Sequence, residues 1–298
     1  MSDTYPVSRR SPGAGVKRLL QTALVLGLAF VLAAALWIWL KQESLLFQPI
    51  ALPVSVALTN EPDVSEDAIE VPGARLSALH LRLPDPKGVV FFLHGNGGNL
   101  QSWFVNTELY RRAGFDLFML DYRGYGKSTG QIESEAQLRA DVRAAWARLA
   151  PQYAGKKIVI YGRSLGTALA AGLTAELNAT DGAQQPSLTV LVSPYSSMVA
   201  LTAEYYPLVP PFLLRYPLRT DEAVSRIRSP LLLFHGDRDT LIAPRHSEVL
   251  KALAPQAQLV RVPGAAHNDV HQFDSYLNAL IGALAALSNY SAQTAKSG

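Results

Sequence analysis

The 298-residue chain contains no cysteine. This absence excludes disulfide bonds, thiolate metal sites and a cysteine nucleophile. It does not identify the compartment, because a chain without thiols tolerates oxidising and reducing conditions equally. We also find no internal repeat and no low-complexity segment.

Charge imbalance is lacking over most of the chain. Residues 1–18 hold four basic residues and one acidic residue, a net charge of +3 (4 − 1), and the whole chain is also +3 (27 − 24). Residues 19–298 therefore sum to zero. A neutral remainder gives no long-range electrostatic support for nucleic-acid binding, so nucleic acid is not an expected partner.

The N-terminal region carries a long apolar run over residues 19–40, a stretch of 22 residues without a charge. At the helical rise it spans about 33 Å, enough to cross a bilayer core. Trp37 and Trp39 lie near one end, where aromatic rings favour the membrane interface. Basic residues precede the run at Arg9, Arg10, Lys17 and Arg18, whereas Lys41 alone follows closely. The positive-inside rule then places residues 1–18 in the cytoplasm and the rest of the chain on the extracytoplasmic side.

A cleaved signal peptide is the alternative interpretation of this segment. Ala33, Ala34 and Ala35 offer a small-residue cleavage site, and Arg9 and Arg10 resemble a twin-arginine signal. The run is long for a signal peptide, so we expect a retained, single-pass membrane anchor.

The rest of the chain divides into three parts. Residues 41–62 form a connector interrupted by prolines, residues 63–290 a single domain, and residues 291–298 a polar tail. Within the domain, short apolar runs alternate with helical patterns, which indicates an α/β fold with a mostly parallel sheet. The predicted strands cover residues 89–93, 115–120, 157–161, 188–193, 231–235 and 257–262. The predicted helices cover residues 100–113, 133–149, 167–177, 247–254 and 270–287.

Residues 162–166 read Gly-Arg-Ser-Leu-Gly and have the G-x-S-x-G spacing of a nucleophile elbow. A predicted strand precedes them and a predicted helix follows. A serine at such a turn is held in a strained conformation, and the flanking glycines make room for the sharp bend. This context predicts that Ser164 is a catalytic nucleophile.

Candidate acid and base groups follow in chain order. Asp239 comes after the strand at residues 231–235, and His267 lies in the loop after the strand at residues 257–262. His267 would take the serine proton, and Asp239 would orient and stabilise the imidazolium. Asp237 is the alternative acid and His271 the alternative base. His267 and His271 also have H-x-x-x-H spacing, but no glutamate follows the first histidine, so we expect no metal site.

The oxyanion of an acyl-transfer reaction needs two N–H donors. We expect the backbone N–H of Leu165 to be one, since it follows the nucleophile. Residues 94–99, His-Gly-Asn-Gly-Gly-Asn, form a glycine-rich loop after a strand, and the backbone N–H of Asn96 is the second candidate. This loop lacks the signatures of phosphate-binding loops, so no nucleotide cofactor is expected.

Taken together, five separated motifs resemble the α/β-hydrolase superfamily, and within it the membrane-anchored α/β-hydrolase-domain serine hydrolases. The motifs are residues 94–99, 121–128, 162–166, 235–239 and 267–269. The resemblance implies an eight-stranded, mostly parallel sheet with helices on both faces. It also implies hydrolysis of esters or thioesters, with Ser164, Asp239 and His267 as the triad, and it supports Asp239 over Asp237.

The segment between the strands at residues 188–193 and 231–235 is aromatic and rich in proline. In the α/β-hydrolase fold this interval commonly carries a cap, which we place at about residues 199–228. It is either a strap packed on the domain or an acyl-binding lid at the membrane surface. The candidate pocket and cap residues are Tyr195, Tyr205, Tyr206, Phe212 and Leu213.

The sequence thus predicts a membrane-anchored serine esterase, lysophospholipase or thioesterase whose substrate is an acyl lipid or small ester. A serine peptidase of the same fold and a catalytically silent binding protein are the alternatives. Dehalogenases and epoxide hydrolases are excluded, because those enzymes need a carboxylate at the position of Ser164.

Overall fold

The computed structural model describes residues 12–294, and the side chains of residues 15–287. The chain divides into two compact units, Met1–Gln42 and Glu43–Gly298. Helix α1 (Pro12–Leu46) contains the predicted span. Its segment Gly15–Leu46 is long and apolar enough to cross a membrane. The predicted N-terminal tail falls mostly on residues 1–11, which lie outside the described part.

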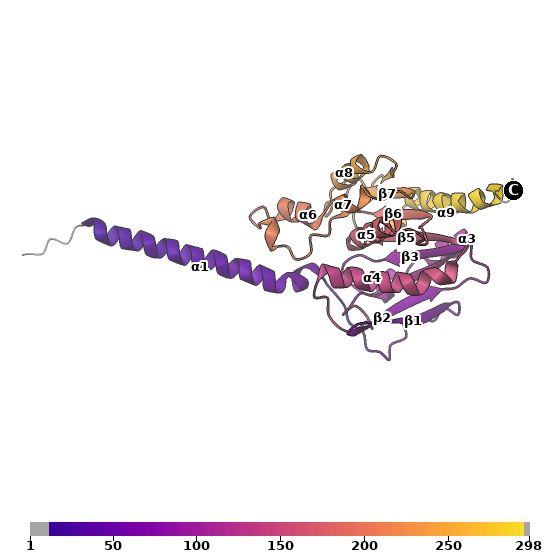
Figure 1. Cartoon of the computed structure of the whole chain (residues 1–298), viewed down its shortest axis with the longest axis horizontal. Coiled ribbons are helices and arrows are strands. Elements are labelled where there is room, and N and C mark those ends of the chain that lie inside the picture. The colour runs from indigo at the N-terminus through magenta and orange to yellow at the C-terminus, as the bar shows by residue number, and fades with distance from the viewer. Residues whose placement is uncertain (1–11, 295–298) are drawn as a thin grey trace, which may run out of the picture. The chain divides into compact units, whose positions relative to one another are not determined.

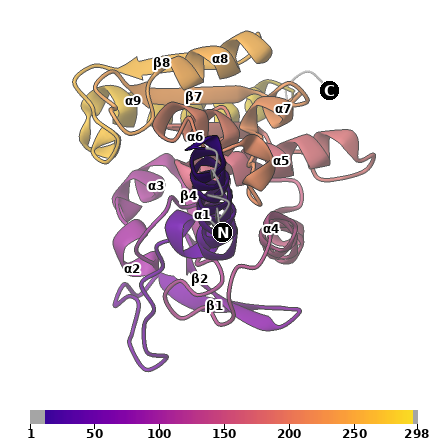
Figure 2. The same cartoon turned by 90° about the vertical axis from the view of Figure 1, so that its left-hand side faces the viewer.

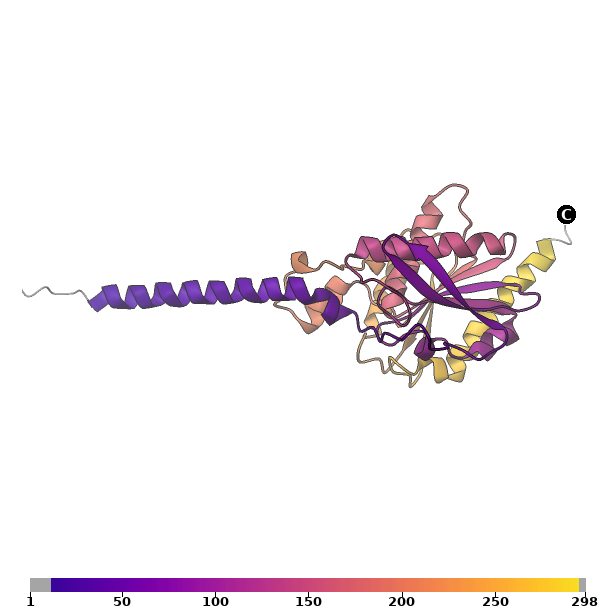
Figure 3. The same ribbon diagram turned by 90° about the horizontal axis from the view of Figure 1, so that it is seen from below.

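The second unit is built on one eight-stranded sheet with the order β1-β2-β4-β3-β5-β6-β7-β8. Strand β2 pairs antiparallel with both β1 and β4, and all the other pairs are parallel. The strands are β1 (Val64–Val71), β2 (Ala74–Leu81), β3 (Gly88–Leu93), β4 (Phe115–Leu120), β5 (Lys157–Arg163), β6 (Leu188–Val192), β7 (Leu231–Gly236) and β8 (Gln258–Val262). Figure 3 shows the strands fanned by the twist of the sheet. The predicted eight-stranded, mostly parallel sheet is confirmed.

Helices cover both faces of this sheet (Figures 1 and 2). On one face lie α4 (Glu135–Leu149), α5 (Leu165–Ala179), α7 (Thr220–Val224) and α8 (Arg245–Leu253); on the other lie α2 (Leu100–Trp103), α3 (Thr107–Ala113) and α9 (Asp274–Thr294). The central strands β3, β4 and β7 are buried along their whole length. They read as continuous apolar runs because a parallel sheet is covered on both sides.

Two predicted helices are interrupted in the structure. The predicted helix 100–113 is two helices, α2 and α3, because Asn106 takes a left-handed conformation with φ of 58° between them. The predicted helix 270–287 begins with a short 3-10 turn, η3 (Val270–Gln272). Phe273 is extended there, and α9 starts at Asp274. His271 therefore lies in a turn beside the strand ends and not within a helix.

The connector after α1 is fastened to the domain by backbone contacts. Ile50 N–H donates to Gly98 at 3.0 Å, and Leu52 N–H donates to Gly126 at 2.7 Å. Phe47 is buried and packs edge-on against Tyr216, with ring centroids 5.1 Å apart. The first residues of the connector thus belong to the body of the hydrolase unit.

The predicted cap interval is partly folded into the domain. Helix α6 (Met198–Tyr205) and the 3-10 turn η2 (Pro211–Leu213) are exposed or half-buried. Tyr216 and Leu218 are fully buried, and α7 belongs to the main core. The exposed part of the cap is therefore residues 198–214. At the other end of the chain, α9 runs to Thr294, into the predicted tail, whose last residues 295–298 lie outside the described part.

Candidate active site

Ser164 occupies a sharp turn between β5 and α5. Its backbone has φ of 50° and ψ of −117°, a conformation that a residue with a side chain rarely adopts. Its N–H donates to Val192 of the neighbouring strand at 2.9 Å. The strand β5 before the turn and the helix α5 after it fix this backbone conformation, and a strained residue that is fixed in this way is typical of functional positions.

Glycine is required at two places where the backbone comes close to this turn. A Cβ on Gly166 would lie 2.0 Å from the carbonyl oxygen of Leu93, at the end of β3. A Cβ on Gly95 would lie 2.7 Å from the Trp103 ring and 3.3 Å from the Ser164 Cβ. The glycine-rich loop after β3 can therefore lie directly against the serine.

The structure brings Ser164, His267 and Asp239 together from three loops at the carboxyl ends of β5, β8 and β7. His267 Nε2 lies 3.0 Å from Ser164 Oγ, and His267 Nδ1 lies 2.7 Å from Asp239 Oδ2. Asp239 and His267 are both buried, with 4% and 8% of their surfaces exposed. The arrangement has the serine–base–acid connectivity of a triad.

Asp239 is held as a carboxylate by its surroundings. Burial opposes its ionisation, but hydrogen bonds from His235, His267 and the Ile242 N–H outweigh burial and keep the pKa of Asp239 well below its usual range. The N–H groups of Leu241 and Ile242 donate to Asp239 Oδ1 at 3.0 and 2.8 Å. These contacts leave Oδ2 directed at His267.

The two alternative residues lie elsewhere. Asp237 is exposed and accepts a hydrogen bond from the Gly264 N–H at 2.7 Å. His271 Nδ1 lies 3.1 Å from Arg163 Nη1. His267 contacts Asp239. Asp237 therefore does not lie in the position of the orienting acid, and His271 does not lie in the position of the base.

The two predicted oxyanion donors flank Ser164. Leu165 is the first residue of α5, where N–H groups lack partners within the helix. Asn96 follows Gly95 in the loop after β3, and both Asn96 and Leu165 line the same pocket as Ser164. The helix dipole of α5 adds positive potential at this point.

The side chain of Asn96 ties this loop to the connector. Its Nδ2 donates to the Leu46 carbonyl at 2.6 Å. Its Oδ1 accepts from the Gln48 N–H at 2.9 Å and from the Tyr125 hydroxyl at 2.9 Å. Below the loop, the buried Tyr122 donates to the His94 carbonyl at 2.8 Å. The turn at residues 121–128 therefore supports the loop structurally.

Ser164 opens into a mostly apolar pocket of about 360 Å³. Three of the predicted pocket residues, Tyr195, Tyr205 and Tyr206, line it. Phe212 and Leu213 do not belong to its lining, and Phe212 is 84% exposed. Sequence reasoning missed other lining residues, namely Leu45, Leu46, Met198, Leu201, Thr202, Leu241 and Ile242. Leu45 and Leu46 carry no local signal, because they fall in the predicted connector, residues 41–62.

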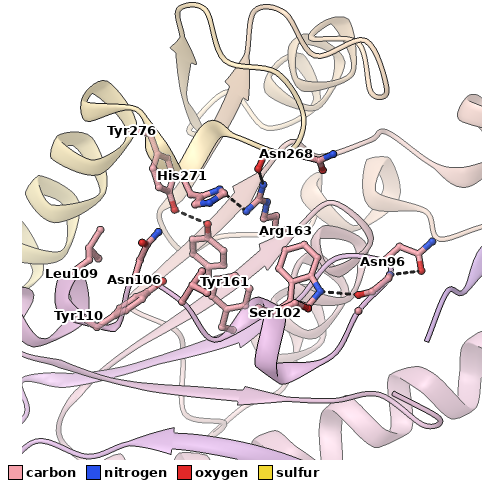
Figure 4. A pocket seen from close by; sticks show the side chains of 15 residues that line it. Asn96, Ser102, Asn106, Leu109, Tyr110, Tyr161, Arg163, Asn268, His271 and Tyr276 are labelled. Carbon is pink, nitrogen blue, oxygen red and sulfur yellow. Dashed lines mark hydrogen bonds between the residues drawn. The ribbon is translucent and has the colours of Figure 1, made fainter. Parts of the chain in front are cut away.

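A second pocket, of about 390 Å³, lies on the other side of the glycine-rich loop. Figure 4 shows Arg163, Asn268 and His271 along one wall, with Leu109, Asn106 and Tyr110 at one end of the pocket and Asn96 at the other. Tyr161 and Tyr276 contact each other through their hydroxyls at 2.6 Å. Asn96 lines both pockets, so the loop separates them.

Within residues 15–287, no group of three or more His, Asp or Glu side chains is placed to hold a metal ion. His94 and His246, like His80, are buried and engaged with neighbouring protein groups.

The amino-acid sequence of this chain is similar to a known family model and to proteins of other organisms. Residues 84–216 match the family model described as serine aminopeptidase, S33. An uncharacterized protein of Mycobacterium tuberculosis is 31% identical over 80% of this chain and 85% of its own length. Alpha/beta hydrolase domain-containing protein 17B of Homo sapiens is 30% identical over 70% of each chain.

Solved structures share the fold at lower identity. An esterase of Pyrococcus furiosus superposes with a TM-score of 0.60 and 21% identity, covering 80% of this chain and 96% of that chain. The thioesterase domain from the curacin biosynthetic pathway has a TM-score of 0.54 and 16% identity, covering 74% and 99%. The sheet order, the relatives and these structures agree, and the chain belongs to the α/β-hydrolase family.

Proposed function

We propose that this protein is a serine hydrolase that cleaves carboxylic esters or thioesters through an acyl-enzyme. The observation that carries the proposal is the contact chain from Ser164 Oγ to His267 and on to Asp239, at 3.0 and 2.7 Å. Family membership supports a hydrolase, and the three side chains supply the nucleophile, the base and the orienting acid.

In the first half-reaction, Ser164 Oγ attacks the substrate carbonyl carbon while His267 Nε2 takes its proton. The carbonyl becomes an oxyanion that the N–H groups of Asn96 and Leu165 stabilise. The tetrahedral intermediate collapses, His267 returns the proton to the leaving alcohol or thiol, and an acyl-serine remains. Water then attacks this ester by the same route, and the acid product leaves Ser164 restored.

The pocket at Ser164 favours an acyl chain. Leu45, Leu46, Met198, Leu201 and Leu241 give it a mostly aliphatic lining. Burial of each methylene contributes about 0.8 kcal/mol. Activity should therefore rise as the acyl chain lengthens from acetyl, up to the length that fills the pocket.

The exposed part of the cap supports a substrate at a lipid surface. Tyr206, Leu208 and Phe212 are 67%, 96% and 84% exposed. Aromatic and leucine side chains of this kind favour the membrane interface. A cap that touches the bilayer would deliver acyl chains to the pocket without passage through water.

The peptidase alternative has weaker support. A peptide amine would need an acidic partner near the pocket. Glu204 in α6 is the acidic residue in the exposed part of the cap, residues 198–214. Glu204 is already paired with Arg245 at 2.6 Å and with His246 at 3.3 Å. Its charge is thus satisfied within the protein.

The membrane anchor is part of the proposal. Helix α1 would cross the bilayer with residues 1–18 in the cytoplasm and the hydrolase unit on the extracytoplasmic side. Only Lys41 and Gln42 separate the apolar run from Glu43, where the hydrolase unit begins. Carbonate extraction and the intact mass of the membrane-bound protein test this. A mass that lacks the first thirty or so residues would establish the cleaved signal instead.

Hydrolysis of a p-nitrophenyl ester series by the full-length protein in detergent tests the activity. We expect turnover that is absent in Ser164→Ala and that increases from acetyl to longer acyl esters. No turnover of any ester by folded wild-type protein would contradict the proposal, and a preference for acetyl would contradict the acyl-pocket assignment.

A further inference from the structure

Arg163 lies beside the nucleophile but on the opposite side of the glycine-rich loop. Ser164 faces the pocket with the aliphatic lining, whereas Arg163 lines the second pocket, of about 390 Å³. The Arg163 side chain is 8% exposed.

The contacts of Arg163 leave part of its donor capacity unused. Nη2 donates to the carbonyls of His267 at 3.2 Å and Asn268 at 3.0 Å, and Nη1 contacts His271 Nδ1 at 3.1 Å. A guanidinium has five N–H donors, and these bonds occupy three. Figure 4 shows the group at the wall of the pocket between His271 and Asn268.

Among residues 15–287, whose side chains the structure describes, no carboxylate forms an ion pair with Arg163. The nearby Asp269 instead accepts the Ala266 N–H at 2.7 Å. The Trp103 ring lies 5.3 Å from the guanidinium carbon and stabilises the cation through its face. Buried charges are normally paired, so an arginine held this way is suited to an anionic ligand.

The rest of the pocket fits a small planar or branched group attached to that anion. Phe92, Trp103 and Tyr161 form aromatic walls, and Asn106, Asn268 and Ser102 contribute polar groups. Burial and the Arg163 charge lower the pKa of His271, which keeps its ring neutral. A neutral imidazole can donate a hydrogen bond to an anion from Nε2 while Nδ1 faces Arg163.

The second pocket lies next to the reacting residues, because Arg163 and Asn268, which line it, are the chain neighbours of Ser164 and His267. Asn96 lines both pockets. A carbonyl carbon at Ser164 Oγ would lie in the aliphatic pocket, with the Arg163 pocket beyond the loop that carries Asn96. The acyl chain fits the first, which leaves the second for the alcohol or thiol part.

We propose that the second pocket binds a leaving group that carries a carboxylate or a phosphate-like anion, and that Arg163 recognises that anion. This specificity rests on the proposed hydrolase function. The natural substrate would then be an acyl ester or thioester of a small anionic alcohol or thiol. No additional chemical step is involved, because Arg163 acts on the part of the substrate that departs.

Hydrolysis of three butyrate esters by the full-length protein tests whether Arg163 recognises an anionic leaving group. They share the acyl group and differ at the para position of the phenol, as esters of 4-hydroxybenzoate, 4-hydroxyphenylphosphonate and the neutral 4-hydroxybenzamide. We expect kcat/KM for an anionic ester to fall about tenfold to a hundredfold more in Arg163→Gln than kcat/KM for the neutral ester. The stronger of the two anionic effects identifies carboxylate or phosphonate as the preferred anion.

Arg143→Gln is the matched control, because Arg143 lies on the exposed surface of α4 with Glu176 as its partner. It removes the same charge and should leave all three rates unchanged. An equal loss on all three esters in Arg163→Gln would overturn the proposal and assign Arg163 to holding the His267 loop alone.

Binding to Ser164→Ala gives a second measurement that needs no turnover. We expect calorimetry to show 4-hydroxybenzoate or 4-hydroxyphenylphosphonate binding at least tenfold more tightly than 4-hydroxybenzamide. Equal binding of all three overturns the proposal. If the wild type hydrolyses no ester but Ser164→Ala discriminates the anions, the hydrolase function fails while the anion site stands.

Discussion

The side-chain amide nitrogen of Asn96 donates a hydrogen bond of 2.6 Å to the backbone carbonyl of Leu46. This contact joins the loop that holds a candidate oxyanion donor to the connector that follows the apolar helix. Tyr125 and Gln48 hold the other end of the same amide. The connector therefore takes part in the geometry of the site and is more than a tether.

Replacing Asn96 with alanine should lower kcat with little change in KM. The backbone N–H of residue 96 would remain, but the bonds that orient it would be lost, and a displaced oxyanion donor costs on the order of tenfold to a hundredfold. Steady-state kinetics on p-nitrophenyl butyrate measures both constants. Gln101→Ala, which removes an exposed hydrogen bond to Ala57 next to the loop, is the control and should be neutral. A rise in KM alone would show that the amide serves substrate binding instead.

The two candidate acids give a paired prediction. Asp239→Asn should reduce kcat by about 10³–10⁴-fold, because an amide at this position favours the wrong tautomer of His267. Asp237→Asn should stay near wild type, since that side chain is exposed and accepts a hydrogen bond from the Gly264 N–H. Comparable losses in both variants, with both proteins folded, would contradict the assignment of Asp239 as the orienting acid.

Two glycine substitutions separate close packing from helix propensity. Gly166→Ala should destabilise the domain by about 3 kcal/mol or more, since its Cβ would meet the backbone of β3. Gly282→Ala, in α9, has no heavy atom within 4 Å of its new Cβ and should stabilise by about 0.5–1 kcal/mol. Thermal unfolding of both variants measures the difference. Similar melting temperatures for the two would mean that the α5–β3 approach is looser than described.

His80 gives a pH dependence of stability. Burial and the nearby Arg82 lower the pKa of His80 to about 4, against an ordinary value of 6.5. The unfolded chain therefore binds more protons than the folded one between these values, so this contribution is fully present above pH 6.5 and is lost as pH falls to about 4. The difference amounts to up to about 3 kcal/mol.

Urea unfolding of wild type and His80→Gln between pH 7 and 4.5 measures this contribution. Glutamine can still hydrogen-bond the Tyr153 hydroxyl, which lies 2.8 Å from His80 Nε2, but it does not titrate. The wild type should lose more stability than His80→Gln over this range. Parallel curves would show that other groups govern the acid sensitivity.

Local patterns in the sequence predicted the six strands β3 to β8 and the order of the site residues, whereas β1 and β2 were not predicted from such patterns. Apolar runs before Ser164, Asp239 and His267 predicted strands, and a parallel sheet brings such strand ends to one edge. The break at Asn106 was missed because a left-handed residue between two apolar stretches leaves the helical pattern almost intact. The break at Phe273 was missed because one extended residue after a short 3-10 turn also leaves the apolar spacing almost intact.

Long-range contacts were the part that the sequence did not reveal. Leu45 and Leu46 fall in the predicted connector, residues 41–62, yet they line the pocket at Ser164. Arg163 occupies the variable position of G-x-S-x-G, which carries no expectation of its own, and its role depends on a loop about a hundred residues away. Such pairings depend on tertiary packing, and neither propensity nor spacing encodes them.

Labelling of the full-length protein with a fluorophosphonate probe, followed by mass spectrometry of the labelled peptide, tests whether Ser164 is the activated nucleophile. We expect a single adduct on Ser164, no adduct in Ser164→Ala, and much slower labelling in His267→Ala because the base is gone. A folded wild-type protein that takes no label, or a label on a different serine, would contradict this assignment.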